Sequence, residues 1–177
     1  MRAVITAALL VAAALPAVAD GADCGWIEEK PRQLPFADIE VGNLVGHTHV
    51  LADFLPLDRP VILHVWATDC KDCRTELPQL ADYAANLKRQ ARRDSLIVIA
   101  ADPAPAATIT RFVNDLGLDG FITLHDRQDR LEDAFGFPGL PATLVVDASG
   151  HLIARRDGPY RWAEAPCRAA LDTFIAE

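Results

Sequence analysis

The chain has 177 residues, a formal net charge of -8 and 51% hydrophobic residues. Its length suits one domain with a sizeable hydrophobic core. Its acidic balance argues against nucleic acids and anionic membrane surfaces as partners, because both carry negative charge themselves.

Residues 1–19 have the composition of an export signal. A basic start at Arg2 precedes an apolar run of thirteen residues over 3–15, and a small-x-small pattern ends at Ala19. A membrane anchor is the alternative reading, but about 20 apolar residues are needed to cross a bilayer. We therefore expect residues 1–19 to be cleaved after export to the periplasm.

Residues 20–35 are polar and show little periodic pattern apart from Cys24 and Trp26. We expect them to form an N-terminal extension that lies over one domain of residues 36–177. The start of that domain, residues 36–51, has β-compatible stretches around Gly46, which indicates a β-hairpin.

The middle of the chain alternates between strands and helices. Residues 61–66 and 95–101 are apolar runs typical of parallel strands buried on both faces. A helix with a kink at Pro78 is expected after the first of them. Next come a helix ending at Gly117, a strand at 121–124, a helix at 128–135, a hairpin over 139–147 and 151–155, and a helix at 163–176. This order predicts an α/β fold in which helices cover both faces of one mixed sheet.

Two cysteines, Cys70 and Cys73, lie two residues apart where the first buried strand meets its helix. Such a pair can close a small-ring disulfide, and a helix N-terminus favours the thiolate of the first cysteine. The spacing therefore predicts redox chemistry. A permanently closed bridge is the structural alternative.

Cys24 and Cys167 are the two remaining cysteines, and in an exported protein both are disulfide candidates. We expect a bond between them, which the chain-entropy account values at about 5 kcal/mol for so long a loop. Two free or resolving thiols are the alternative.

A zinc ribbon is disfavoured, because the chain offers one close cysteine pair and His47 and His49 stand only two positions apart. No metal site is expected.

These motifs together resemble those of the exported thioredoxin-like proteins of the TlpA, ResA and CcmG (DsbE) group. The likeness covers the chain from about residue 34 onward, and its ending at residues 157–162 looks most like the TlpA branch. The matching residues are Trp66, Cys70, Cys73, Glu76, Pro78, residues 139–143, Asp147 and Gly150. The resemblance implies a thioredoxin-like fold with an N-terminal β-hairpin extension and a short strand and helix inserted before the cis-proline strand.

The resemblance also implies roles for individual residues. Cys70 would be the exposed nucleophile and Cys73 the buried resolving thiol. Pro141 would be a cis-proline beside the sulfurs, although a trans-proline at the start of an edge strand is the alternative. Leu140 and Thr143 would line the same groove, with Trp66 as a supporting residue.

Glu76 matches an acidic residue that this group carries three positions after the second cysteine. A carboxylate one helical turn from Cys73 would disfavour the neighbouring thiolate and help to move protons during exchange. A solvated glutamate on the first turn of the helix is the alternative.

His64 stands on the first buried strand, where the group often has asparagine and thioredoxins have aspartate. It could relay protons for Cys73, form a hydrogen-bonded part of the core, or bind Cu(I) together with the two thiols. His47, His49, His125 and His151 belong to no motif, so we expect them on the surface or at strand ends.

The charges around Cys70 also depart from the group. Asp69 replaces a second tryptophan and, with Asp72, would destabilise the Cys70 thiolate, whereas Lys71 and Arg74 act in the opposite direction. The net effect on the thiolate stays open.

The resemblance implies a periplasmic thiol:disulfide oxidoreductase that works mainly as a reductant. A membrane thiol-disulfide donor would supply its electrons, and a client protein with a cysteine pair would receive them. The favoured client is a copper chaperone or the copper subunit of cytochrome oxidase, followed by apocytochrome c. We expect a monomer without a cofactor. The alternatives are a Cu(I)-binding chaperone and an oxidant that forms disulfides in secreted proteins.

Overall fold

Two parallel strands form the centre of the structure, a computed structural model that describes residues 24–56, 58–128 and 130–176. β4 (Val61–Trp66) and β5 (Leu96–Ala101) pair in parallel, with Trp66 opposite Ala100. Every residue of β4 is buried, as its continuous apolar run predicted. The predicted export signal, residues 1–19, lies outside the described residues.

The sheet of the described residues has eight strands in the order β1-β8-β7-β4-β5-β6-β2-β3. β7 (Ala142–Val146) runs antiparallel between β4 and β8 (His151–Asp157), while β6 (Leu124–Asp126) runs parallel to β5. The other strands are β1 (Ile27–Gln33), β2 (Glu40–Gly42) and β3 (Thr48–Val50). The mixed sheet confirms the predicted α/β class, and β2 and β3 form the predicted hairpin.

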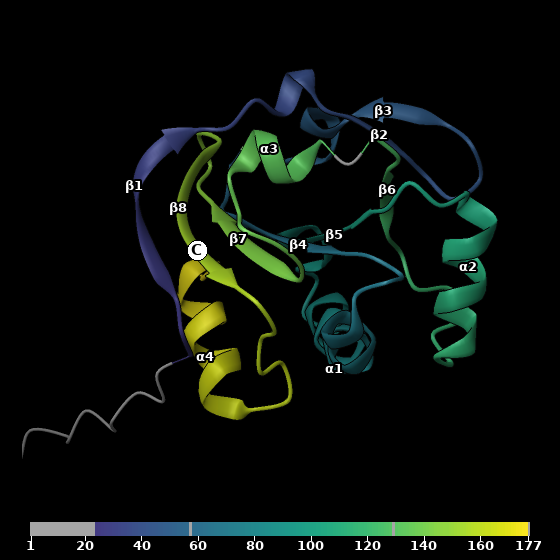
Figure 1. The fold of residues 1–177 in the computed structure, drawn as a ribbon. Helices are drawn as coiled ribbons and strands as arrows, with labels where there is room; N and C mark the ends of the chain where they lie inside the picture. The colour runs from purple at the N-terminus through teal and green to yellow at the C-terminus, as the bar shows by residue number, and fades with distance from the viewer. Residues whose placement is uncertain (1–23, 57, 129, 177) are drawn as a thin grey trace, which may run out of the picture.

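Helices cover both faces of the sheet (Figure 1). α1 (Lys71–Arg89), α2 (Ala106–Asp115) and α4 (Ala165–Phe174) pack into one core, and α3 (Leu131–Phe135) packs into the other. Short 3-10 turns lie at Phe36–Asp38, Leu51–Phe54 and Arg93–Ser95. In the described part of the chain, no helix combines the length and apolarity that crossing a bilayer requires.

The alternation of side chains along β4 positions the site. Ile62 and Trp66 belong to the core that contains α1, whereas Leu63 and Val65 belong to the opposite core. Because successive strand residues point to opposite faces, His64 shares the α1 face with Ile62 and Trp66. The functional residues of the strand and the helix therefore meet in one layer.

Some element boundaries differ from the predicted ones. β6 starts at Leu124 rather than at 121, while α1 contains Pro78 within its length, as predicted. α3 starts only at Leu131, because the Asp126 carboxylate accepts hydrogen bonds from the backbone N–H groups of Gln128, Arg130 and Leu131 and holds those residues in a turn.

β1 is an edge strand that the sequence pattern did not predict. It pairs antiparallel with β8, and an ion pair of 2.9 Å joins Glu29 to Arg155 of that strand. Its side chains are polar and mostly exposed, so it lacks the alternation by which a half-buried strand is recognised. Pro31 fits this edge position, where one row of backbone groups needs no partner.

Candidate active site

Cys70 and Cys73 differ in exposure in the way that an exchange pair requires. Cys70 is the N-cap residue of α1, and its sulfur accepts a hydrogen bond of 3.1 Å from the backbone N–H of Cys73. The two sulfurs form a disulfide with an S–S distance of 2.04 Å. Cys70 is partly exposed, whereas Cys73 is fully buried. A sulfur of another molecule can therefore reach Cys70 but not Cys73.

Pro141 follows a cis peptide bond, as the resemblance implied. Val65 is opposite Ala142 in the antiparallel register of β4 and β7. One further step of this register places Pro141 level with Trp66, at the end of β4 from which the cysteine loop departs. Leu140, just before it, is half-buried and packs against both cores.

A buried ionisable pair lies one turn along α1 from Cys73. Nε2 of His64 is 3.1 Å from Oε1 of Glu76, at ion-pair distance but without the alignment of a hydrogen bond. The other carboxylate oxygen, Oε2, accepts a hydrogen bond of 2.7 Å from the backbone N–H of Tyr160. The exposed fractions of His64 and Glu76 are 0% and 3%. A charge on either side chain is thus shielded from water, and its stability depends on the interaction with the other side chain.

This burial corrects two expectations. The alternative of a solvated Glu76 is wrong, because the side chain points into the core and binds Tyr160. Thr143, expected to line a groove with Leu140, is fully buried instead, and its Oγ1 lies 3.1 Å from Nδ1 of His64. The reason is the register of the sheet, which places Thr143 directly opposite His64.

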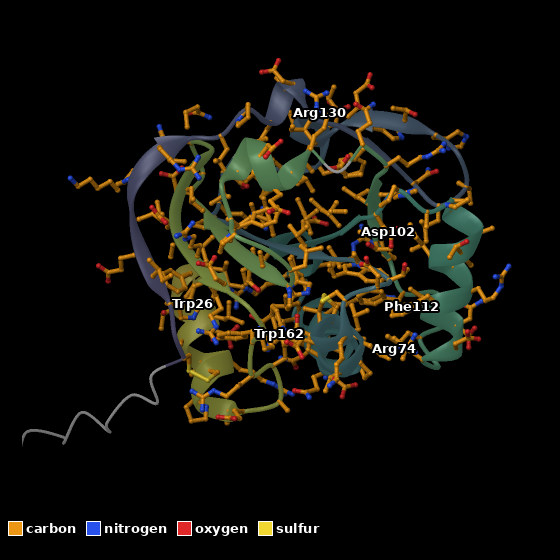
Figure 2. The ribbon with its side chains drawn as sticks, viewed as in Figure 1. Trp26, Arg74, Asp102, Phe112, Arg130 and Trp162 are labelled. Atoms are coloured by element: carbon orange, nitrogen blue, oxygen red, sulfur yellow. A yellow bond between two sulfur atoms is a disulfide. The ribbon has the colours of Figure 1, made fainter. Side chains whose placement is uncertain are left out.

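Trp66 supports the site from inside the core. It is fully buried, its Nε1 donates to Oγ1 of Thr123 at 3.2 Å, and its ring stacks on Phe112 with centroids 5.5 Å apart. The guanidinium carbon of Arg74 lies 4.4 Å from the centroid of the Phe112 ring. Figure 2 shows Arg74 and Phe112 between α1 and α2. Trp66 thereby anchors the end of β4 to α2.

The four charged residues around Cys70 all lie in solvent: Asp69, Lys71, Asp72 and Arg74. Water and salt screen the interactions of exposed charges strongly. The helix N-terminus and the Cys73 amide act on the Cys70 sulfur at close range. The Cys70 sulfur therefore has a backbone N–H at hydrogen-bond distance, whereas the four surrounding charges are screened.

Asp102 holds the loop that carries Cys70, and sequence reasoning missed it. Its Oδ2 accepts hydrogen bonds from the backbone N–H and the hydroxyl of Thr68, at 2.8 and 2.6 Å, and Oδ1 accepts from the N–H of Ala104. Burial raises the pKa of Asp102, but these hydrogen bonds together outweigh it and keep the pKa below its usual value. One sequence signal was available for this contact. Asp102 directly follows a buried parallel strand. It stands two positions after Ala100, and Thr68 stands two positions after Trp66, the residue that pairs with Ala100.

Replacing Asp102 by alanine is expected to lower the free energy of unfolding at pH 7 by about 2–3 kcal/mol, because three partly buried donors lose their charged acceptor. A carboxylate whose pKa is lowered by folding adds stability above its unfolded pKa and loses it as the pH falls through the folded one. The difference in unfolding free energy between Asp102→Ala and wild type should therefore shrink below about pH 4. Urea unfolding at several pH values measures it, with the exposed Asp119→Ala as control. A difference that does not depend on pH would contradict the assignment.

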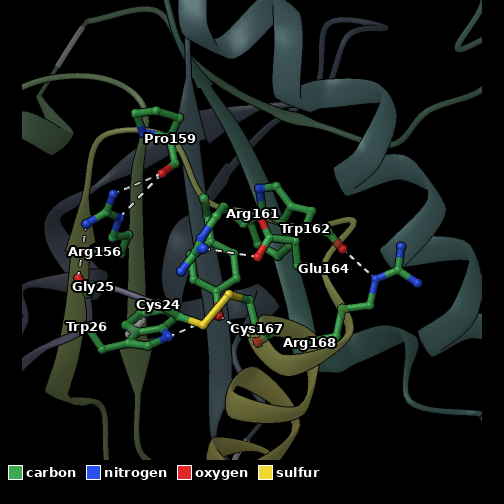
Figure 3. The surroundings of a disulfide bond; sticks show 11 residues. Cys24, Gly25, Trp26, Arg156, Pro159, Arg161, Trp162, Glu164, Cys167 and Arg168 are labelled. Atoms are coloured by element: carbon green, nitrogen blue, oxygen red, sulfur yellow. Dashed lines mark hydrogen bonds and ion pairs between the residues drawn. A yellow bond between two sulfur atoms is a disulfide. The ribbon is translucent and has the colours of Figure 1, made fainter. Parts of the chain in front are cut away.

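A second disulfide joins Cys24 to Cys167, which confirms the predicted bridge (Figure 3). The two Cα atoms are 5.6 Å apart, and both side chains are buried. The bond connects the segment before β1 to α4 across 143 positions of sequence. It therefore fixes the N-terminal segment beside the last helix.

The other histidines divide between surface and core. His47 and His49 are exposed and His151 is half-buried, as expected. The expectation for His125 was wrong. It is 2% exposed within β6, and its Nε2 lies 2.8 Å from the backbone oxygen of Asp102, a hydrogen bond that makes its burial tolerable.

No cluster of three or more His, Cys, Asp or Glu side chains that could hold a metal ion occurs within 24–56, 58–128 and 130–176. Both ring nitrogens of His64 are also engaged, Nδ1 with Thr143 and Nε2 with Glu76. The binding of Cu(I) by His64 and the two thiols stays a prediction.

The fold and the cysteine pair define a thioredoxin-like protein. The same fold occurs in a secreted thiol-disulfide isomerase from Corynebacterium glutamicum, with a TM-score of 0.61 and 24% identity over 85% of this chain and 90% of that one. The chain belongs to the AhpC/TSA family, which it matches over residues 33–155.

Two of the relatives bear names of the group that the motifs resemble. The thiol-disulfide oxidoreductase ResA of Geobacillus kaustophilus is 29% identical over 116 residues, which are 65% of this chain and 63% of that protein. A DsbE homologue of Paracoccus denitrificans, a thiol:disulfide interchange protein, is 28% identical over 144 residues, or 76% of each chain. The match thus spans a little under two thirds of the length of the ResA relative. Assignment to the TlpA branch stays a prediction.

Proposed function

We propose that this protein is an exported, periplasmic thiol:disulfide oxidoreductase that works mainly as a reductant of cysteine pairs in client proteins. The observation that carries the proposal is the unequal exposure of Cys70 and Cys73 at the start of α1. The AhpC/TSA family match and the names of the ResA and DsbE relatives support the same chemistry. The motif resemblance supports the reductive direction.

The reaction transfers two electrons in two exchange steps. In the first step the Cys70 thiolate of the reduced protein attacks one sulfur of the client disulfide, which breaks, and the released client thiolate takes a proton. In the second step Cys73 loses its proton and attacks the Cys70 sulfur. The mixed disulfide then breaks, the Cys70–Cys73 bond forms, and the client leaves with both sulfurs reduced.

His64 and Glu76 are proposed to accept the proton that Cys73 loses in the second step. Cys73 is fully buried, so bulk water does not reach its thiol, whereas Glu76 lies one helical turn away on the same helix. His64 contacts the Glu76 carboxylate at 3.1 Å and can share an incoming proton with it. A buried acid-base pair beside a buried thiol is suited to general-base catalysis.

The proposed clients are proteins that bind a metal or haem through a cysteine pair. A copper chaperone or the copper subunit of cytochrome oxidase comes first, and apocytochrome c second. A membrane thiol-disulfide protein is the proposed electron donor, and the protein is proposed to act as a monomer. These partners rest on the motif resemblance, while the chain's own residues account for the exchange chemistry.

A Cys73→Ser variant is expected to remain covalently attached to its client through Cys70, because the second exchange step cannot occur. Affinity purification from the cell envelope under non-reducing conditions, followed by mass spectrometry, identifies what is attached. Copper- or haem-assembly proteins are expected. The matched control, Cys70→Ser, should capture nothing, since Cys73 is buried. Recovery of unrelated secreted proteins alone would argue against a dedicated reductant.

The reduction potential distinguishes the proposed reductant from an oxidant. Equilibration of the Cys70–Cys73 pair with glutathione buffers measures it. Strong oxidants of this fold lie near about -120 mV, because their reduced form is stabilised, whereas thioredoxin lies near about -270 mV. A value close to the former would overturn the reductive direction while leaving the exchange chemistry intact.

A further inference from the structure

The second oxygen of the Glu76 carboxylate is held by a backbone group from a distant part of the chain. The Tyr160 N–H donates to Oε2 at 2.7 Å, from the segment between β8 and α4 and across 84 positions of sequence. A backbone N–H has no rotamers of its own. Its position relative to the carboxylate is therefore set by whatever holds that segment in place.

The phenol of Tyr160 is one anchor of the segment. Its hydroxyl donates to the backbone oxygen of Cys167 at 2.6 Å and accepts a hydrogen bond of 3.1 Å from Nε1 of Trp26. The ring centroid lies 5.3 Å from that of Trp26 and 5.1 Å from that of Trp162. Burial raises the pKa of Tyr160, so the hydroxyl keeps its proton and remains a donor. The phenol thus joins the segment after β8 to α4, seven positions further along the chain, and to the distant Trp26.

The second disulfide belongs to the same cluster. Cys167, whose backbone oxygen binds the phenol, is bonded to Cys24, which stands two positions before Trp26. On the other side of the cluster, Trp162 packs edge-on against His64 with centroids 5.3 Å apart. Figures 2 and 3 show Trp26 and Trp162 on either side of this region, near α4. A continuous set of contacts therefore leads from the disulfide to the buried His64–Glu76 pair.

We propose that Tyr160 is a positioning residue for the exchange reaction, which transmits the fixed position of the Cys24–Cys167 disulfide to the Glu76 carboxylate. The proposal deepens the proposed function and rests on it. The phenol holds the segment, and the segment places the N–H that stabilises the anionic form of Glu76. When this N–H moves away, the anion loses a short hydrogen bond inside the core and Glu76 accepts the Cys73 proton only at higher pH.

The ionisable neighbours of Glu76 are few. β4 contributes His64 at 3.1 Å, and α1 contributes Cys73 one turn earlier. The segment after β8 contributes the uncharged N–H of Tyr160, while its Arg161 makes an ion pair of 3.0 Å with Glu164. A change of pH profile caused by altering Tyr160 would therefore act through the hydrogen bond to the carboxylate or through the packing of Trp162 on His64, and Tyr83→Phe tests the second route because Tyr83 also packs on Trp162.

The test is the reaction of the reduced protein with dithiobis(nitrobenzoate), an aromatic disulfide that releases one coloured thiolate at each exchange step. The first release reports the attack by Cys70, and the second reports closure by Cys73. In Tyr160→Phe the pH at which the second rate is half-maximal should rise by about half a unit. The first rate and its pH profile should match those of wild type.

Tyr83→Phe is the matched control. Tyr83 is also buried, its hydroxyl also bonds to α4, through Oδ1 of Asp172 at 2.9 Å, and its ring also packs on Trp162. It has no hydrogen bond to the segment that binds Glu76. The control should lose stability as Tyr160→Phe does and keep the wild-type pH profile. Equal shifts in the two variants, or none in either, would overturn the role of Tyr160.

A second variant covers the case in which Tyr160→Phe fails to fold. Trp26→Phe removes the Nε1 donor to the phenol without altering Tyr160, and should shift the second rate in the same direction by a smaller amount. A wild-type profile for Trp26→Phe would count against the linkage. Absence of the first release in wild type would instead refute the proposed function. Failure of the proposed function can therefore be told apart from failure of the role of Tyr160.

Discussion

A Glu76→Gln variant is expected to close the Cys70–Cys73 disulfide about a hundredfold more slowly than wild type at pH 7. Glutamine has nearly the same size and keeps an oxygen for the Tyr160 N–H, but it cannot take a proton. General-base catalysis contributes roughly 100- to 10,000-fold to proton transfers of this kind. The second release from dithiobis(nitrobenzoate), followed by rapid mixing, measures the closure rate.

The first release should be almost unchanged in this variant, because it depends on the accessible Cys70 sulfur. Asp72→Asn is the control, since it removes an exposed carboxylate from the same first turn of α1. It should leave both rates within a factor of two of wild type, given the weak influence of screened charges. A closure rate in Glu76→Gln within threefold of wild type would reduce Glu76 to a structural residue.

Removing the second disulfide is expected to have the largest effect on stability. A Cys24→Ser/Cys167→Ser variant should lose about 2–5 kcal/mol of unfolding free energy, because the bond closes a long loop in the unfolded chain. The separation between the two cysteines is 143 positions, against 3 for Cys70 and Cys73. Urea unfolding of the oxidised proteins, monitored by tryptophan fluorescence, measures the loss.

Cys70→Ser/Cys73→Ser is the internal comparison for that experiment. The chain-entropy account assigns its short loop only about 2 kcal/mol, so it should be the more stable of the two double variants. The reverse order of stability would show that loop entropy does not govern the contribution of the second disulfide.

The sequence was most informative where function depends on local spacing. The positions of Cys70 and Cys73, at the end of an apolar strand and the start of a helix, predicted both the N-cap sulfur and the buried partner. Continuous apolar runs predicted β4 and β5 for the same reason, since burial on both faces leaves a direct mark on composition. The cis bond before Pro141 was predicted through the family resemblance alone.

Most of the interactions that sequence reasoning missed are non-local. Pairing of His64 with Glu76 depends on how α1 packs on β4, and pairing of Asp102 with Thr68 on which strand lies beside β4; periodicity carries no information on either. His64 was considered as a proton relay for Cys73, and the structure places Glu76 beside its Nε2 and Thr143 beside its Nδ1. Tyr160 was missed because the group it offers to Glu76 is a backbone N–H, which every non-proline residue possesses.

β1, the strand that was not predicted, also affects how readily the molecule pairs with other chains. β1 occupies one margin of the sheet and carries exposed charges at Glu28, Lys30 and Arg32, with Pro31 among them. Charged side chains and proline on a margin discourage another chain from adding a strand there. Without β1, the outer backbone of β8 would be open to a second copy of the protein. β1 thus covers the edge of β8, and shortening the N-terminal segment should favour aggregates that grow strand by strand.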